Sequence, residues 1–128
     1  MPVASKAVSG EIERGEWASF FGDFSKRNQS RATRLETFGE LGAQKEEQNL
    51  PLNGISVEET GTDAPRIEIM LGGDSPSDER HLTHTIERAA RVITKISDNG
   101  QQDEALEIED ADGNKTLLRF ESLPRLNR

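Results

Sequence analysis

Two histidines and two arginines near them are the side chains of this chain that could bind a ligand or transfer a proton in a pocket. His81 and His84 are its only histidines, so His84 is the one plausible general base near neutral pH. Arg88 and Arg91 follow closely and could hold an anion beside it. We therefore treat His84, Arg88 and Arg91 as candidate ligand-binding residues. The simpler interpretation is that one histidine lies in a polar loop and the other bonds to backbone.

The sequence around these histidines gives little support for catalysis or metal binding. Asp78 and Glu79 lie close by, but a catalytic zinc needs a third protein ligand in a shaped cavity, and no residue fixes one. The sequence lacks a Gly-x-Ser-x-Gly motif, a P-loop and a dinucleotide fingerprint, and it contains no cysteine. Thiol nucleophiles, disulfides and zinc–thiolate sites are therefore excluded. We predict no catalytic residue, no metal and no cofactor.

The run DADGNKTLLRFE at residues 110–121 has the oxygen spacing of a calcium loop. Asp110, Asp112 and Asn114 stand at alternate positions, and a glutamate is twelfth, where an EF-hand keeps its bidentate carboxylate. The sixth position, however, needs glycine for a sharp turn and holds Lys115 here. Both flanks of the run also alternate as strands do, whereas an EF-hand loop lies between helices. We therefore predict a β-hairpin.

Four basic residues form a second candidate surface for interactions, namely Lys26, Arg27, Arg31 and Arg34. No acid interrupts them, whereas residues 98–112 contain seven acids and no base. The two segments could be opposite poles of a head-to-tail or partner interface, or two solvated surfaces that keep the protein soluble. Contact with RNA has little support, because the aromatic residues nearby are expected in the core and not free for base stacking.

Composition places these candidates on one small domain. The chain has 128 residues, of which 32% are apolar and 31% charged, enough for a modest core. Its net charge of −8 argues against a general binder of nucleic acid or anionic membranes. The opening MPVASKAVSG lacks the apolar run of a signal peptide, and no apolar run is long enough to span a bilayer. We expect a cytoplasmic protein without membrane contact.

The strongest local signal is an aromatic stripe with helical spacing. Trp17, Phe20, Phe21 and Phe24 fall at i, i+3, i+4 and i+7, so their rings share one face of a helix expected over about residues 11–28. Such a stripe could bind a membrane or a partner. The chain has few other large apolar groups, so we predict that the stripe fills the protein's own core.

Beyond this helix the apolar residues alternate, which predicts strands. We expect them at residues 35–38, at 44–59 in two pieces broken around Pro51, at 67–71 and at 91–97. Because Pro51 cannot donate a ladder hydrogen bond, it implies an edge, a bulge or a bend. The segment 80–96 fits helical and strand spacing alike. We predict a short helical turn at 80–88 before the last of these strands, because β-branched residues concentrate only in the second half.

The final two strands are predicted to form a hairpin whose register follows from burial. With a three-residue turn at 112–114, Ile108 faces Leu118 and Leu106 faces Phe120, which puts nearly all apolar side chains on one face. A loop with an even number of residues would place the apolar residues of the second strand among glutamates. We therefore predict the odd loop, with its asparagine in the left-handed conformation.

Together these elements predict an α+β domain over residues 11–123, with flexible segments at 1–10 and 124–128. The N-terminal helix lays its aromatic stripe on a curved antiparallel sheet of six or seven strands, and closure into a small barrel stays open as an alternative. For function, we favour a non-catalytic binding module that contacts a protein partner or a second copy through an exposed edge such as the Pro51 strand. The alternative is a small enzyme or ligand-binding barrel with a pocket near His84.

Four short sequence motifs follow one another along the chain. They are the aromatic stripe from Trp17 to Phe24, Leu50-Pro51-Leu52 with Gly54-Ile55, His84-Thr85-Ile86, and Asp110-Ala111-Asp112-Gly113 before Thr116-Leu117-Leu118. In this order and spacing the chain resembles, over about residues 14–121, a family of short bacterial proteins defined as a domain of unknown function. The resemblance implies the same order of elements and a bacterial cytoplasmic setting. It brings no substrate, cofactor or catalytic residue.

Overall fold

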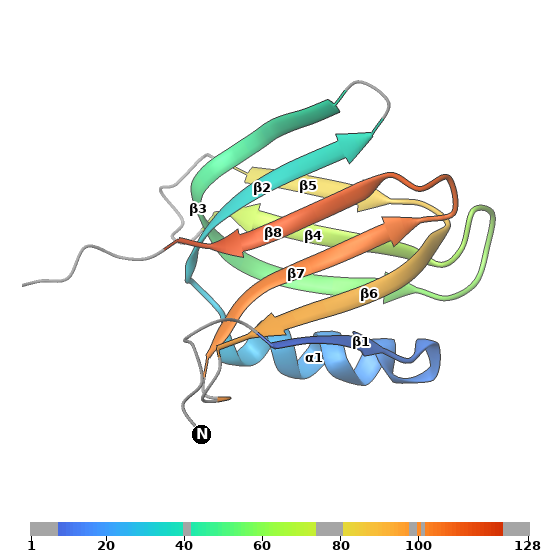
Figure 1. Ribbon diagram of the computed structural model, residues 1–128, viewed down its shortest axis with the longest axis horizontal. Coiled ribbons are helices and arrows are strands. Elements are labelled where there is room, and N and C mark those ends of the chain that lie inside the picture. Colours follow the sequence, from blue (N-terminus) through green and yellow to red (C-terminus); the bar gives the residue numbers. More distant parts are fainter. Residues whose placement is uncertain (1–7, 40–41, 74–80, 98–99, 101, 122–128) are drawn as a thin grey trace, which may run out of the picture.

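The structure is a computed structural model, which places one helix beside a large antiparallel sheet (Figure 1). The residues that it describes are 8–39, 42–73, 81–97, 100 and 102–121. In chain order the elements are β1 (Val8–Ile12), a 3-10 turn (Arg14–Glu16), α1 (Trp17–Arg27), β2 (Ala32–Gly39), β3 (Gly42–Glu58), β4 (Arg66–Gly72), β5 (His81–Ile86), β6 (Ala89–Ile96), β7 (Asp103–Asp110) and β8 (Lys115–Phe120).

The sheet has eight strands in the order β1-β6-β7-β8-β2-β3-β4-β5, and it folds over on itself into two layers (Figure 1). Strand β3 belongs to both layers, because its first part pairs with β2 and its last part with β4. The two ends of the sheet, β1 and β5, do not pair with each other. The expected α+β class is confirmed, whereas six or seven strands was too few and closure into a barrel was wrong.

Pro51 marks the point where β3 bends and changes partner strands. It lies opposite Ala32 of β2, and the next residue, Leu52, pairs with Leu71 of β4, so β3 changes partners at this point. A register shift follows between Leu52 and Gly54. The bend and the neighbouring bulge are two of the roles that the missing N–H allowed. Each half of β3 pairs on one side only, residues 42–51 with β2 and residues 52–58 with β4, so contact with a partner through this strand stays a prediction.

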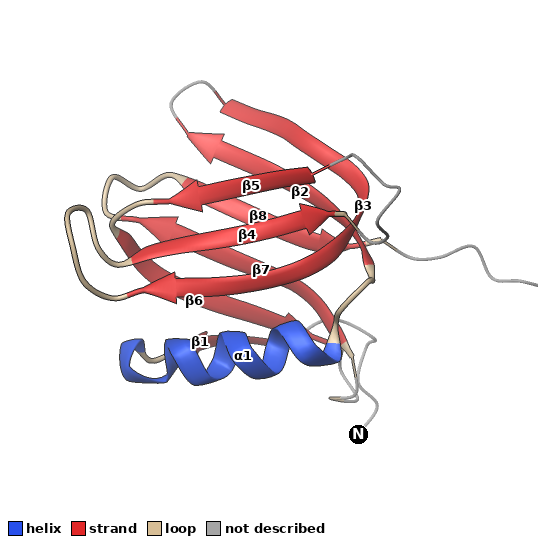
Figure 2. Cartoon of the chain, turned by 180° about the vertical axis from the view of Figure 1, so that it is seen from behind, coloured by secondary structure: helices blue, strands red, loops and turns tan. Residues whose placement is uncertain are grey.

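Helix α1 buries the aromatic stripe as predicted, and it lies along the open side between the two layers (Figure 2). Trp17, Phe21 and Phe24 are buried, and Phe20 is partly buried against the same cluster. The helix ends at Asn28, whose backbone N–H and side-chain amide both donate to the carbonyl of Phe24. None of the described helices is long and apolar enough to cross a membrane.

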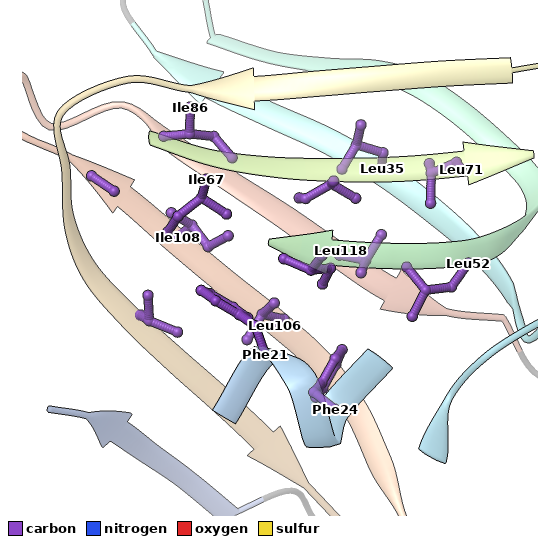
Figure 3. Packing of buried hydrophobic residues seen from close by; sticks show 14 of the residues in the cluster. Phe21, Phe24, Leu35, Leu52, Ile67, Leu71, Ile86, Leu106, Ile108 and Leu118 are labelled. Carbon is purple, nitrogen blue, oxygen red and sulfur yellow. The ribbon is translucent and has the colours of Figure 1, made fainter. Parts of the chain in front are cut away.

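The core fills the space between the layers. The side chains labelled in Figure 3 come from α1 and from strands of both layers, and they point toward one another. Ser25 fixes the helix to β3, since its hydroxyl donates to the carbonyl of Ile55 at 3.3 Å and accepts from the same residue's N–H at 2.9 Å. Leu50 and Leu52, two residues apart on β3, are buried as well.

Two local predictions were wrong. Residues 8–10, expected in a flexible extension, lie in β1 and pair with β6, and the helix begins at Trp17 after a 3-10 turn and not near residue 11. The helical turn expected at 80–88 is instead strand β5 from His81, which pairs with β4 through Ile86. The alternating Leu82, His84 and Ile86 were the correct signal there. The tail expected at 124–128 lies outside the described residues.

The hairpin has the predicted odd loop, displaced by one residue. Leu106 pairs with Leu118 and Glu109 with Lys115, so the loop residues are 111–113. Gly113 takes the left-handed conformation with a φ of 89°, which a residue without a side chain adopts at least cost. The predicted faces are right, but each residue of β7 faces the partner two positions earlier on β8 than we expected.

Two buried threonines differ in their hydrogen bonding, so replacing each with valine should change the free energy of unfolding in opposite directions. The Thr33 hydroxyl donates to the Leu50 carbonyl at 2.8 Å, whereas the buried Thr94 hydroxyl has no partner among the described residues. We expect Thr94→Val to raise the free energy of unfolding by about 1 kcal/mol, because it removes a desolvated hydroxyl. The same change at Thr33 should lower it by about 1–2 kcal/mol. Urea denaturation measures both, and equal effects would contradict the two environments.

Candidate functional site

A large hollow on the described surface is basic. It has a volume of about 870 Å³ and lies where β2 and β7 begin and β8 ends. Four cationic side chains line it, and we call it the basic hollow. They are Arg31, Arg34, Lys95 and Arg119.

Strand register explains how three of these cations come together. Lys95 of β6 lies opposite Ala105 of β7, Ala105 lies opposite Arg119 of β8, and Arg119 lies opposite Arg34 of β2. Residues directly opposite in antiparallel strands point to the same face. Lys95, Ala105, Arg119 and Arg34 therefore form one row across the face of the sheet that points away from the core. The small Ala105, only 4% exposed, is the floor between the longer side chains.

Arg34 and Arg119 share a single carboxylate. The Nε of each lies 3.6 Å from an oxygen of Glu36, a separation that allows charge attraction but exceeds a hydrogen bond. Arg34 Nε is shielded from solvent and has no hydrogen-bond acceptor among the described residues. Two guanidinium groups thus face the same hollow with only loose compensation from described side chains.

A buried carboxylate, Asp103, supports the hollow from beneath. It accepts hydrogen bonds from Arg27 Nε at 2.7 Å, from Arg27 Nη2 at 3.1 Å and from Asn28 Nδ2 at 2.8 Å. Burial acts to raise the pKa of Asp103, but the hydrogen bonds from Arg27 and Asn28 and the nearby guanidinium charges prevail and hold this pKa below its ordinary value. The network ties the end of α1 to the start of β7.

Arg31 is held in place by the same network. Its Nη1 donates to the side-chain oxygen of Asn28 at 2.8 Å and to the backbone carbonyl of Asp103 at 3.0 Å. Its guanidinium lies over the ring of Phe120, 4.1 Å from the centroid. Burial lowers the pKa of Arg31, and the charge of Asp103 opposes that shift. Arg31 is therefore a fixed wall of the basic hollow, whereas the side chains of Arg34 and Arg119, 41% and 48% exposed, make only a loose contact with Glu36.

The second hollow contains His84. It has a volume of about 370 Å³ and includes Thr37, Thr116 and Arg88 in its lining. His84 is opposite the buried Ile69 and so points inward from β5, where its Nε2 lies 3.4 Å from the Thr116 hydroxyl. The contact joins the two layers of the sheet.

Arg88 and Arg91 have separate positions. Arg88 reaches Asp63 at 3.1 Å and Asp112 at 2.9 Å, so it joins three connections at one end of the sheet. Arg91 lies outside the His84 hollow, where it contacts Glu11 and Glu109, each at 3.2 Å. The structure therefore brings His84 and Arg88 together and leaves Arg91 apart.

The basic segment is divided in the same way. Arg31 and Arg34 line the basic hollow, Arg27 pairs with Asp103, and the exposed Lys26 lines neither hollow. The basic and acidic segments, which we expected to be separate poles, are thus joined within the chain by the pair of Arg27 and Asp103. Sequence reasoning missed Lys95 and Arg119. Both face outward on their strands, and the correct hairpin register would have placed Arg119 beside Ala105.

Metal binding has no support in the part of the chain that the structure describes, where no three His, Cys, Asp or Glu side chains gather as a metal site would require. Comparison with known proteins gives one family model, which matches residues 8–127. No curated protein and no solved structure matches the chain. The matched segment begins at the first residue of β1 and includes both hollows. The chain belongs to a family of unknown function, DUF5335.

Proposed function

We propose that this domain is a non-catalytic binding module that holds an anionic ligand in the basic hollow. The observation that carries the proposal is the row of Lys95, Arg119 and Arg34 over the small Ala105. Guanidinium groups recognise oxyanions through directed, charge-assisted hydrogen bonds. A rigid sheet holds these donors in place before a ligand arrives, which reduces the entropy lost on binding.

The charge of the hollow differs from that of the whole protein. The net charge is −8, yet the lining of this hollow has four cations against the acids Asp103, Glu104 and Glu121. Asp103 is already paired with Arg27 outside the lining. An acidic protein with a local basic site repels most anions at long range and retains those that fit the site. Selectivity of this kind suits a binding module.

The His84 hollow is the weaker alternative. Its volume is less than half that of the basic hollow. RNA also fits the basic hollow poorly, because Phe120, the aromatic ring in its lining, is covered by Arg31. Base stacking needs an open ring face. An anionic ligand that is bound by the guanidinium groups alone fits better.

Arg119→Gln tests the proposal directly. We expect this variant to bind a polyanionic probe such as pyrophosphate about tenfold or more weakly, because one charge-assisted contact is lost. Isothermal titration calorimetry measures the affinity. Arg119 is 48% exposed, so the variant should fold normally, which circular dichroism checks.

The matched control is Arg91→Gln. Arg91 is exposed to a similar degree, 49%, and lies on the same outer face, but it does not line the basic hollow. Its loss should change the affinity by less than about twofold, as expected for a screened distant charge. Equal weakening by both variants, or absence of pyrophosphate binding to the parent protein, would contradict the proposed function.

A further inference from the structure

We propose that the basic hollow is selective for a phosphomonoester dianion over a carboxylate, and that Glu36 is the internal competitor that sets this preference. The inference rests on the proposed function and names its ligand class. Its basis is the geometry of Arg34, Arg119 and Glu36 on β2 and β8.

The first argument concerns charge. Arg34 and Arg119 are directly opposite on adjacent strands, where side chains approach to about 5 Å and like charges repel. Lys95 adds a third positive charge in the same row. Glu36 offers one negative charge that Arg34 and Arg119 share. A carboxylate ligand carries one negative charge, the same as Glu36, and so gains little by replacing it. A phosphomonoester dianion carries two negative charges and is attracted more strongly.

The second argument concerns hydrogen bonds. Glu36 approaches each Nε only to 3.6 Å, so neither contact is a hydrogen bond. Arg34 Nε is shielded from solvent, so a ligand must reach this arginine, whose side chain is 41% exposed, through its terminal Nη groups. A phosphate group carries three terminal oxygens in a tetrahedral arrangement. It can reach both guanidinium groups at once and still leave an oxygen for Lys95.

The third argument concerns room. Ala105 leaves space between Lys95 and Arg119, where a larger residue would fill the row. The register shift between Lys95 and Ile96 places Glu104 at a bulge of β7, and its exposed side chain is at the rim. The floor is therefore apolar and neutral, while the charges surround it. This arrangement admits a phosphate group and lets the rest of its ester extend into solvent.

The experiment compares phenyl phosphate with benzoate, which share the ring and differ in the anionic group. At about pH 7.5 phenyl phosphate is mostly a dianion. We expect it to bind at least about tenfold more tightly than benzoate in calorimetric titrations with the full chain at about 0.15 M salt. A phosphoserine peptide in a third titration distinguishes a protein-borne phosphate from a free ester. Tighter binding of either phosphate probe than of benzoate supports the shared chemistry.

Glu36→Gln tests the role of the competitor. Removing its charge should tighten phenyl phosphate binding about fivefold, because two loose ion pairs no longer have to be broken. The matched control is Glu107→Gln on the same face of the sheet, where the side chain pairs with Lys115 at 3.9 Å. It removes the same charge without freeing either arginine. The control should change the affinity by less than about twofold.

The outcomes separate this inference from the proposed function. If pyrophosphate binds in an Arg119-dependent way but benzoate binds as well as phenyl phosphate, the binding function stands and phosphate selectivity is refuted. An equal gain in Glu36→Gln and Glu107→Gln would refute the competitor role, since net charge alone would explain it. Failure of every anion to bind would overturn both.

Discussion

Replacing Phe24 with alanine is expected to lower the free energy of unfolding by about 3–5 kcal/mol. The ring is fully buried between α1 and the sheet, and it packs on Phe20 and Phe120 with centroids at 5.3 Å and 5.7 Å. Its loss leaves a cavity that the sheet closes only in part, because both layers are fixed by their ladders. Urea denaturation followed by tryptophan fluorescence measures the change.

Phe20→Ala is the matched control on the same helix face. Phe20 is only partly buried, so we expect a loss of about 1–2 kcal/mol. Sedimentation velocity should show the same molecular mass for both variants and the parent. If Phe24→Ala cost no more than Phe20→Ala, or if it changed association and left stability intact, burial of the stripe in the protein's own core would be wrong.

Asp103→Asn is expected to lower the free energy of unfolding at neutral pH by about 2–3 kcal/mol. The change removes the charge that both Arg27 and Asn28 contact. The loss stays below that of a fully buried ion pair because Arg27 is 47% exposed and water can replace part of its pairing.

The pH dependence of this effect has a definite sign. The pKa of Asp103 is lower in the folded protein than in the unfolded chain, so its carboxylate stabilises the fold above the unfolded-state pKa. That contribution disappears as the pH falls through the lower folded-state pKa. The difference between parent and Asp103→Asn should therefore shrink in acid. Glu104→Gln, next to it and exposed, should stay within about 0.5 kcal/mol at every pH. A constant difference from neutral to acid pH would contradict the shifted pKa.

The parts of the fold that could be predicted from the sequence are those with a single consistent periodicity. The spacing from Trp17 to Phe24 defined the buried face of α1, and Ile67 to Leu71 defined β4. Strand β5 was missed because Leu82, Ile86 and Ala89 fit a helical stripe as well as an alternating one. Pairing with β4, a contact distant in sequence, decides between the two.

The candidate site was only half predictable for a related reason. Arg31 and Arg34 were found because they are close in sequence, whereas Lys95 and Arg119 join them only through the pairing of β6, β7, β8 and β2. An error of two positions in one hairpin was enough to separate Arg119 from Ala105. Local patterns do not fix long-range register unless a turn residue defines it, and here Gly113, not the neighbouring asparagine, takes the left-handed position.

The assignment of the basic hollow is best tested by nuclear magnetic resonance of the arginine side chains during titration with phenyl phosphate. Each arginine Nε–H group gives its own signal, so Arg34 and Arg119 can be compared with Arg91 in one sample. We expect the Arg34 and Arg119 signals to move strongly and to saturate together, because an anion bound to a guanidinium group changes the electronic environment of its Nε–H. The Arg91 signal should stay in place. Movement of Arg91 alone, changes confined to the His84 hollow, or no change at any concentration would contradict the assignment.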